Sequence, residues 1–96
     1  MILEHAILDV RAGEEKSFES AFGRVRPLIE ETPGFQRLEL RPCIERNGRY
    51  LLLVWWESVE AHTQGFRGSA RYDEWKKALH HFYEPFPEVQ HYAPSL

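Results

Sequence analysis

A chain of 96 residues has room for one domain with one hydrophobic core, here residues 1–96. A net charge of −3 without a cluster of Lys and Arg argues against nucleic acid as a partner, and no apolar run could span a bilayer. The single cysteine, Cys43, cannot form an internal disulfide, and the acidic N-terminus MILEHAILDV does not read as a signal peptide. We therefore expect a cytoplasmic protein.

The first predicted elements are a strand and a helix. Ile2–Val10 is apolar on both of its faces, so both faces should be covered. Glu14–Glu31 has apolar residues at helical spacing, namely Phe18, Ala21, Phe22, Val25, Leu28 and Ile29. Pro27 lies inside this pattern and cannot donate a hydrogen bond to the carbonyl of Gly23. Because the apolar stripe continues past Pro27, we expect the proline to bend the helix without ending it.

Two further strands are predicted after the helix stops at Thr32-Pro33-Gly34. Phe35–Cys43 and Tyr50–Trp56 should form an antiparallel pair, connected by a hairpin that contains Asn47-Gly48. Pro42 places the first of them at a sheet edge, because proline cannot donate to the hydrogen-bond ladder. The second is a continuous apolar run, which is typical of a strand covered on both faces.

The rest of the chain is predicted to be helical and then extended. A helical stretch runs from Ser58 to about Tyr83 and is interrupted near Gly68. Ser58 and Ser69 can each cap the helical segment that follows. Glu88–Tyr92 is predicted as a short last strand.

The order of these elements predicts the fold. Strand, helix, strand, strand, helix, strand with right-handed crossovers gives an α+β, ferredoxin-like split βαβ fold with a four-stranded antiparallel sheet. Its helices can cover only one face of that sheet. Since Ile2–Val10 and Tyr50–Trp56 are apolar on both faces, we expect a homodimer through the open sheet face.

We expect any catalytic residues to lie where the predicted strand Tyr50–Trp56 leads into the helical stretch that starts at Ser58. Val59, His62 and Phe66 are three and four residues apart, so they share one face, which we expect to point inward. Burial and the positive end of a helix that starts at Ser58 would lower the pKa of His62 and keep its ring neutral. A neutral ring could be a catalytic base, or a core group whose hydrogen bonds a backbone carbonyl satisfies, and both interpretations remain open.

The other histidines give weaker candidates. His5 shares a strand face with Leu3 and Ile7, and it would reach the same pocket if that face points at the helices. It is the second candidate base, although a core or edge histidine is an equally good interpretation. His80-His81 are interpreted as structural or exposed. His91 and His5 lack the spacing of metal ligands, so no metal is expected.

An aromatic share of 14% indicates either a core built from large side chains or an aromatic-lined pocket. The candidate substrate-binding residues are aromatic or cationic side chains, namely Trp56, Phe66, Arg67, Tyr72, Trp75 and Phe22. Trp56 and Trp75 could stack on a planar substrate or simply belong to the core. Arg67 could hold a phenolate or carboxylate, or form a surface ion pair with Glu60 or Glu74.

Three groups of residues, spread over nearly the whole chain, carry a resemblance to a known family: TPGF, LLLVWWESVEAHTQGFRGS, and EWKKAL with FYEPFPEVQHY. In these residues the chain resembles the antibiotic biosynthesis monooxygenase (ABM) domain family, and GFRGS is similar to a subgroup of small members. The resemblance implies a dimeric α/β barrel, in which two ferredoxin-like sheets pack face to face. It also implies a monooxygenase without cofactor that oxidises a small aromatic, quinol or polyketide-like substrate with dioxygen. Such an enzyme removes a phenolic or benzylic proton and holds the anion in a dry pocket.

The same resemblance implies two alternatives. Members without an established activity suggest a non-catalytic dimeric ligand-binding or regulatory barrel. Other members degrade haem, with an Asn on the first strand and a Trp and a His on the second helical segment. Those positions correspond here to His5, a position near Gly65, and Trp75 or Lys76, so the haem-degrading set is not reproduced. Gly65 also stands where characterised members often carry a histidine.

Overall fold

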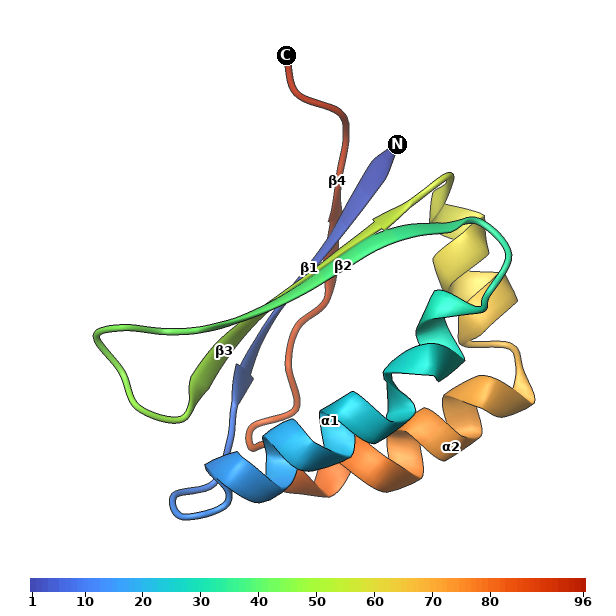
Figure 1. The fold of residues 1–96 in the computed structure, drawn as a ribbon. Coiled ribbons are helices and arrows are strands. Elements are labelled where there is room, and N and C mark those ends of the chain that lie inside the picture. Colours follow the sequence, from blue (N-terminus) through green and yellow to red (C-terminus); the bar gives the residue numbers. More distant parts are fainter.

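The computed structural model describes residues 1–96 and shows a four-stranded antiparallel sheet with its helices on one face (Figure 1). The strands, in the sheet order β2-β3-β1-β4, are β1 (Ile2–Asp9), β2 (Phe35–Pro42), β3 (Arg49–Trp56) and β4 (Gln90–Tyr92). The helical elements are α1 (Glu15–Glu30), the π-helix η1 (Ala61–Phe66), α2 (Ala70–Leu79) and the 3₁₀ turn η2 (His80–Phe82). This is the predicted ferredoxin-like α+β fold. No helix is long and apolar enough to cross a membrane.

The central strand β1 separates two different faces of the sheet. It pairs with β3 along its whole length and with β4 on its other side. Its even-numbered side chains from Glu4 to Leu8 are buried under the helices. Its odd-numbered side chains from Leu3 to Ile7 lie on the opposite face, which no helix covers (Figure 1). The prediction that helices would cover only one face is therefore confirmed, as is the edge position of β2.

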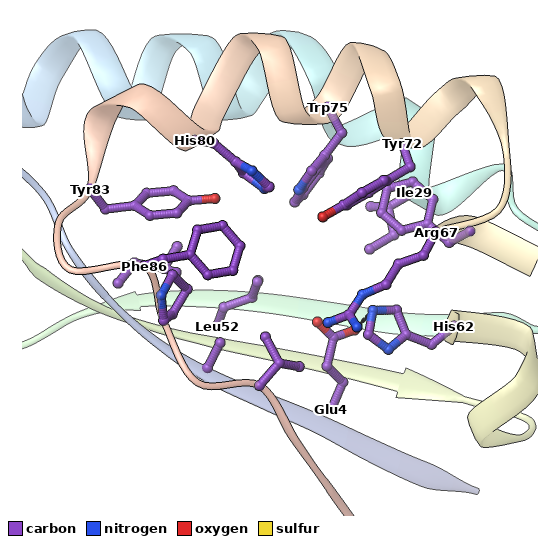
Figure 2. Close-up of a pocket in the computed structure, with 15 residues that line it drawn as sticks. Glu4, Ile29, Leu52, His62, Arg67, Tyr72, Trp75, His80, Tyr83 and Phe86 are labelled. Carbon is purple, nitrogen blue, oxygen red and sulfur yellow. Dashed lines mark ion pairs between the residues drawn. The ribbon is translucent and has the colours of Figure 1, made fainter. Parts of the chain in front are cut away.

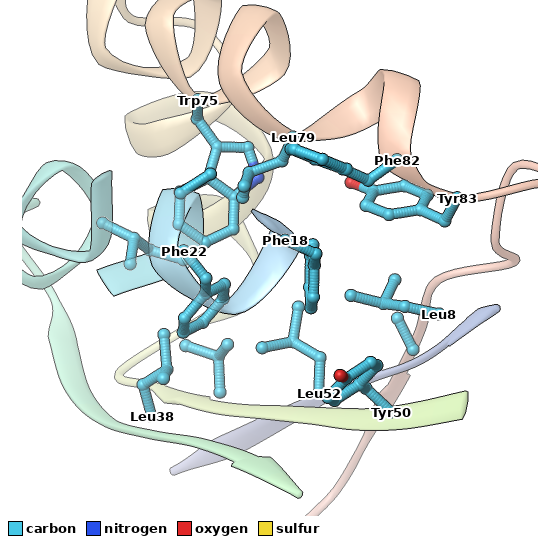
Figure 3. Close-up of a cluster of buried hydrophobic side chains, with 14 of the residues drawn as sticks. Leu8, Phe18, Phe22, Leu38, Tyr50, Leu52, Trp75, Leu79, Phe82 and Tyr83 are labelled. Carbon is cyan, nitrogen blue, oxygen red and sulfur yellow. The ribbon is translucent and has the colours of Figure 1, made fainter. Parts of the chain in front are cut away.

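The core lies between the sheet and the helices and is rich in aromatic rings (Figure 3). Phe18 of α1 is fully buried at its centre. Four rings surround it, with centroids 5.0–6.2 Å away, namely Phe22, Tyr50, Phe82 and Tyr83. The hydroxyl of Tyr50 donates a hydrogen bond of 2.6 Å to Glu19, so its polar end is satisfied. Much of the aromatic content thus belongs to the core.

Pro27 behaves as predicted. Helix α1 continues through it to Glu30, and the N–H of Glu31 still donates to the carbonyl of Pro27. Figure 1 shows the helix axis changing direction in its second half. Ile29, beyond the proline, is 1% exposed and packs into the core. The lost hydrogen bond therefore bends the helix, while apolar burial on both sides of the bend holds it together.

Gly34 positions the start of the second crossover, which is the segment from β3 to β4 that contains η1, α2 and η2. Its φ is +90°, a backbone conformation that favours glycine, and a Cβ there would lie 2.6 Å from the Cβ of Ala61. Its carbonyl accepts a hydrogen bond of 2.8 Å from the N–H of Glu57, directly after β3. The Thr-Pro-Gly-Phe turn thus fixes the point at which the chain leaves the sheet and enters η1.

We expect Gly34→Ala to lower the free energy of unfolding by roughly 1–3 kcal/mol, because it adds backbone strain and a clash with Ala61. Urea unfolding at neutral pH measures this change. Gly23→Ala is the matched control, since its Cβ would meet nothing within 4 Å and it lies inside α1. The control should be neutral or stabilising by about 0.5–1 kcal/mol. Equal stability of both variants would show that the turn is not tight.

The two predicted helix caps have different outcomes. Ser58 accepts a hydrogen bond of 3.1 Å from the N–H of Ala61 through its hydroxyl, as predicted. Ser69 is the N-cap residue of α2, at the predicted position, but its hydroxyl donates to the carbonyl of Phe66 and makes no capping hydrogen bond to α2. Ser69 therefore closes the turn behind η1, a local use of its hydroxyl that competes with capping.

Candidate active site

A small cavity of about 40 Å³ lies between the sheet and the second crossover (Figure 2). Five of the predicted site residues line it, namely His62, Phe66, Arg67, Tyr72 and Trp75. Its other walls come from β1, β3, the end of α1 and the segment that leads to β4. The cavity has a polar end at Glu4, His62 and Arg67, and an aromatic end near His80, Tyr83 and Phe86 (Figure 2).

Glu4 is a buried carboxylic acid at the polar end. It sits on the helix-facing side of β1 and is 5% exposed. Its Oε1 accepts a hydrogen bond of 2.9 Å from the indole N–H of Trp56 and lies 3.3 Å from Nε2 of His62. Burial raises the pKa of Glu4 to about 7, against the smaller opposing effects of the Trp56 hydrogen bond and the charge of Arg67. A carboxyl group that titrates near neutral pH can take up and release protons at the working pH.

His62 is buried, as predicted, and lies on the π-helix η1. Its ring stacks on the indole of Trp56, with centroids 5.4 Å apart. Its Nδ1 shares a hydrogen bond of 2.8 Å with Nε2 of His91 on β4. Burial, and then the charges of Arg67 and His91, lower the pKa of His62 to about 3, so the ring is neutral at neutral pH. The partners of the ring are thus two side chains and not the backbone carbonyl of the core interpretation.

The π-helix explains why two polar side chains reach the same end of the cavity. The N–H of Arg67 donates a hydrogen bond of 3.0 Å to the carbonyl of His62, five residues earlier. This wider turn brings Arg67 and His62 to one side of the element, where Figure 2 shows the guanidinium reaching toward Glu4. The side chain of Arg67 provides a positive charge near the carboxyl group without removing its ability to titrate.

The aromatic end is closed by a segment without regular structure. Phe86 is 62% exposed, and its ring lies 4.9 Å from the ring of His80, between centroids. Burial lowers the pKa of His80 and raises the pKa of Tyr83, so both groups are neutral at neutral pH. The histidine that we interpreted as structural or exposed is therefore a half-buried part of the cavity wall.

Three predicted site residues lie outside the cavity lining. His5 points to the uncovered face of the sheet, where its ring meets the edge of Tyr92, so the expectation that it reaches the pocket is wrong. The reason is strand parity, because Glu4 occupies the helix-facing position next to it. Trp56 is 0% exposed and lies behind His62, and Phe22 packs in the core against Trp75. Both are aromatic groups of the core and not of the cavity surface.

Sequence reasoning missed Glu4 and His91, the two polar neighbours of His62, and it also missed His80 and Tyr83 at the aromatic end. Glu4 is the one acid on a strand face that otherwise carries Ala6 and Leu8, and this unusual position was the available signal. His91 is the cross-strand partner of Glu4, a relationship that depends on the sheet register and is not visible in the sequence.

The fold and the site together define a ferredoxin-like protein with a buried acid–histidine pair between its sheet and its second crossover. The family model of the antibiotic biosynthesis monooxygenases (ABM) matches residues 1–78. The chain therefore belongs to this family.

Similar proteins agree with this assignment. YczJ of Bacillus subtilis (strain 168), an uncharacterised protein, is 48% identical over 92 residues, which cover 96% of this chain and 97% of YczJ. A solved structure from Bordetella bronchiseptica, assigned to the antibiotic biosynthesis monooxygenases, is 36% identical with a TM-score of 0.92 and covers 99% and 97% of the two chains. SnoaB of Streptomyces nogalater, a cofactor-independent oxygenase, is 19% identical with a TM-score of 0.83 and coverages of 99% and 93%. At that identity, SnoaB shows a shared fold.

Proposed function

We propose that this protein is a cofactor-independent monooxygenase that oxidises a small aromatic, quinol or polyketide-like substrate with dioxygen. The observation that carries the proposal is the buried Glu4, whose pKa is raised to about 7 inside an aromatic-lined cavity. Family membership supports it, because the family takes its name from monooxygenases. SnoaB, which shares the fold, is a cofactor-independent oxygenase.

The chemistry needs a base, a cation and a dry cavity. Glu4, as carboxylate, takes a phenolic or benzylic proton from the substrate, and the charge of Arg67 stabilises the resulting anion. The anion gives one electron to dioxygen, and the two radicals combine into a carbon–oxygen bond. The peroxide formed in this way takes up a proton. Loss of the remaining C–H proton with cleavage of the oxygen–oxygen bond then forms a carbonyl, which keeps one oxygen atom, and releases the other as water. The substrate provides all the electrons, so Glu4 must move protons only.

The size of the cavity restricts how a substrate can enter. At about 40 Å³ the cavity holds only a few waters, whereas ligand pockets usually measure about 300–1,000 Å³. A ring can bind only if the exposed side chain of Phe86 and the segment around Pro87 move outward. This segment lies outside helices and strands, so its displacement breaks no sheet or helix hydrogen bonds.

An oxygen electrode tests the proposed activity directly. A panel of hydroquinones and anthrones is added to the purified protein, and oxygen uptake is compared with uptake in buffer alone. We expect faster uptake with at least one compound, together with a product that contains one new oxygen atom. No acceleration with any compound of the panel would count against the proposal.

The small cavity favours a second candidate, a non-catalytic dimeric ligand-binding or regulatory barrel. In that case a panel compound would raise the melting temperature of the protein without any oxygen uptake. Haem has less support, because a macrocycle is much larger than the cavity. A Soret shift on adding haemin would instead favour haem binding over the non-catalytic barrel.

We also propose that the uncovered sheet face is the interface of a homodimer. Apolar side chains of the two central strands lie on it and are exposed or half-buried in the single chain, namely Leu3, Ile7, Leu51, Leu53 and Trp55. At its edge, Arg49 and Asp9 form an ion pair at 2.8 Å. An apolar patch with a charged rim is typical of a protein interface.

Light scattering at micromolar concentration is expected to report twice the chain mass of 11.4 kDa. Burying an open sheet face places the interface in the obligate class, with about 2,000 Å² or more in total. Leu53→Glu should shift the population toward monomer, because it places a charge at the centre of this face. A monomeric wild-type protein would contradict the proposal.

A further inference from the structure

We propose that Glu4, His62 and His91 form a proton relay that connects the closed cavity to solvent at the edge of the sheet. This inference rests on the role proposed above for Glu4. It goes further because it assigns a function to His91 and a path to the proton that Glu4 takes up.

The three groups form an unbroken row. Oε1 of Glu4 lies 3.3 Å from Nε2 of His62, and Nδ1 of His62 lies 2.8 Å from Nε2 of His91. The two nitrogens of the His62 ring thus face different partners, so a proton can arrive at one nitrogen while another leaves from the other. The sheet register holds the ends of the row together, because Glu4 and His91 are direct cross-strand partners.

The relay transfers a proton while the ring of His62, the more buried of the two histidines, stays neutral. In the starting state the Glu4 carboxyl donates its proton to Nε2 of His62, and the N–H at Nδ1 donates to Nε2 of His91. In the transfer, the oxygen–hydrogen bond of Glu4 breaks and an N–H forms at Nε2 of His62. The N–H at Nδ1 breaks at the same time, and an N–H forms on His91. The products are a carboxylate, a neutral His62 in its other tautomer, and an imidazolium at His91 that can release its second proton to water.

Solvent exposure increases from Glu4 and His62 to His91, as expected for proton transfer from the cavity toward solvent. Glu4 and His62 are 5% and 3% exposed, whereas His91 is half-buried on the edge strand β4. Burial, and then the charge of Arg67, lower the pKa of His62 and of His91, which favours the release of a proton from both rings. The same charge partly offsets the rise that burial gives to the pKa of Glu4. Trp56 donates to Glu4 and stacks on His62, so it fixes both groups in position.

His91 lies beyond residues 1–78, the part of the chain that the family model matches. The place of His91 in the relay therefore rests on its contact with His62 and on its register with Glu4, and not on family membership.

Nitrogen-15 NMR of the histidine rings tests the relay on the substrate-free protein. As pH rises from about 5 to about 9, we expect His62 to change from the Nδ1–H to the Nε2–H tautomer at the pH where the Glu4 carboxyl titrates. In Glu4→Gln this change should disappear. In His91→Gln, solvent exchange of the His62 ring N–H should slow about tenfold or more, because an amide cannot pass a proton on.

His81→Gln is the matched control, since His81 is exposed and lies outside the row, and it should leave tautomer and exchange unchanged. A single His62 tautomer over the whole pH range would overturn the relay, and this measurement needs only the wild-type protein. Unchanged exchange in His91→Gln would overturn the role of His91. Because no substrate is present, a tautomer change without oxygen uptake would support the relay while the proposed activity fails.

Discussion

Glu4→Gln is expected to lower the turnover of an oxidised panel substrate by about 10²-fold to 10⁴-fold, with little change in KM. At the position of Oε1, the amide oxygen can still accept the hydrogen bond of the Trp56 indole and can accept one from an N–H at Nε2 of His62, so the site keeps its shape. The variant lacks only the titratable proton of the Glu4 carboxyl group. Steady-state oxygen uptake measures kcat and KM, and the unfolding midpoint in urea shows whether the variant is folded.

Two further variants test whether Glu4 acts as a base or has only a structural role. Glu74→Gln changes an exposed acid of α2 in the same way and should leave turnover unchanged. His62→Gln leaves the carboxyl of Glu4 in place but disrupts its partner, and we expect it to cost roughly 1–3 kcal/mol of stability. If Glu4→Gln kept full turnover while His62→Gln lost it, His62 and not Glu4 would be the base.

The fold could be predicted from the sequence because its signals are local. The apolar run of β3, the helical spacing in α1 and the turn residues between the strands each indicate one element. Element order and crossover handedness then leave few arrangements of four strands and two crossovers. The boundaries agree within a few residues. The larger differences are η1, which begins at Ala61 and not at Ser58, and β4, which covers Gln90–Tyr92 instead of Glu88–Tyr92.

The site was harder to predict because it depends on strand parity and on partners distant in sequence. His62 followed from local spacing, and its burial and lowered pKa were predicted correctly. His5 was misplaced because β1 is apolar on both faces, so the pattern cannot show which face meets the helices. Glu4 and His91 became a pair only through the sheet register. The π-helix, which brings Arg67 beside His62, also has no signature in the spacing of apolar residues.

Glu4 and His62 are expected to give the folded protein two opposing pH dependences. The folded pKa of Glu4, about 7, lies above its unfolded value of 4.5, so between these values the folded state binds more protons. Its contribution therefore lowers the free energy of unfolding by roughly 3 kcal/mol as pH rises through this interval. The folded pKa of His62, about 3, lies below its unfolded value of 6.5, so its contribution raises the free energy of unfolding as pH rises from about 3 to 6.5.

In the wild-type protein these slopes nearly cancel between about pH 4.5 and 6.5, where the free energy of unfolding should be almost flat. In a variant that lacks one of the two groups, the pH dependence that the other group gives to the free energy of unfolding is no longer cancelled. Glu4→Gln should keep gaining stability up to about pH 6.5, whereas His62→Gln should lose roughly 3 kcal/mol between about pH 4.5 and 7. Urea unfolding at a series of pH values measures the three curves, with Glu74→Gln expected to follow the wild type. Parallel curves for all four proteins would mean that neither group is buried with the pKa described here, and the acid–histidine pair would then lose its basis as a proton-transfer site.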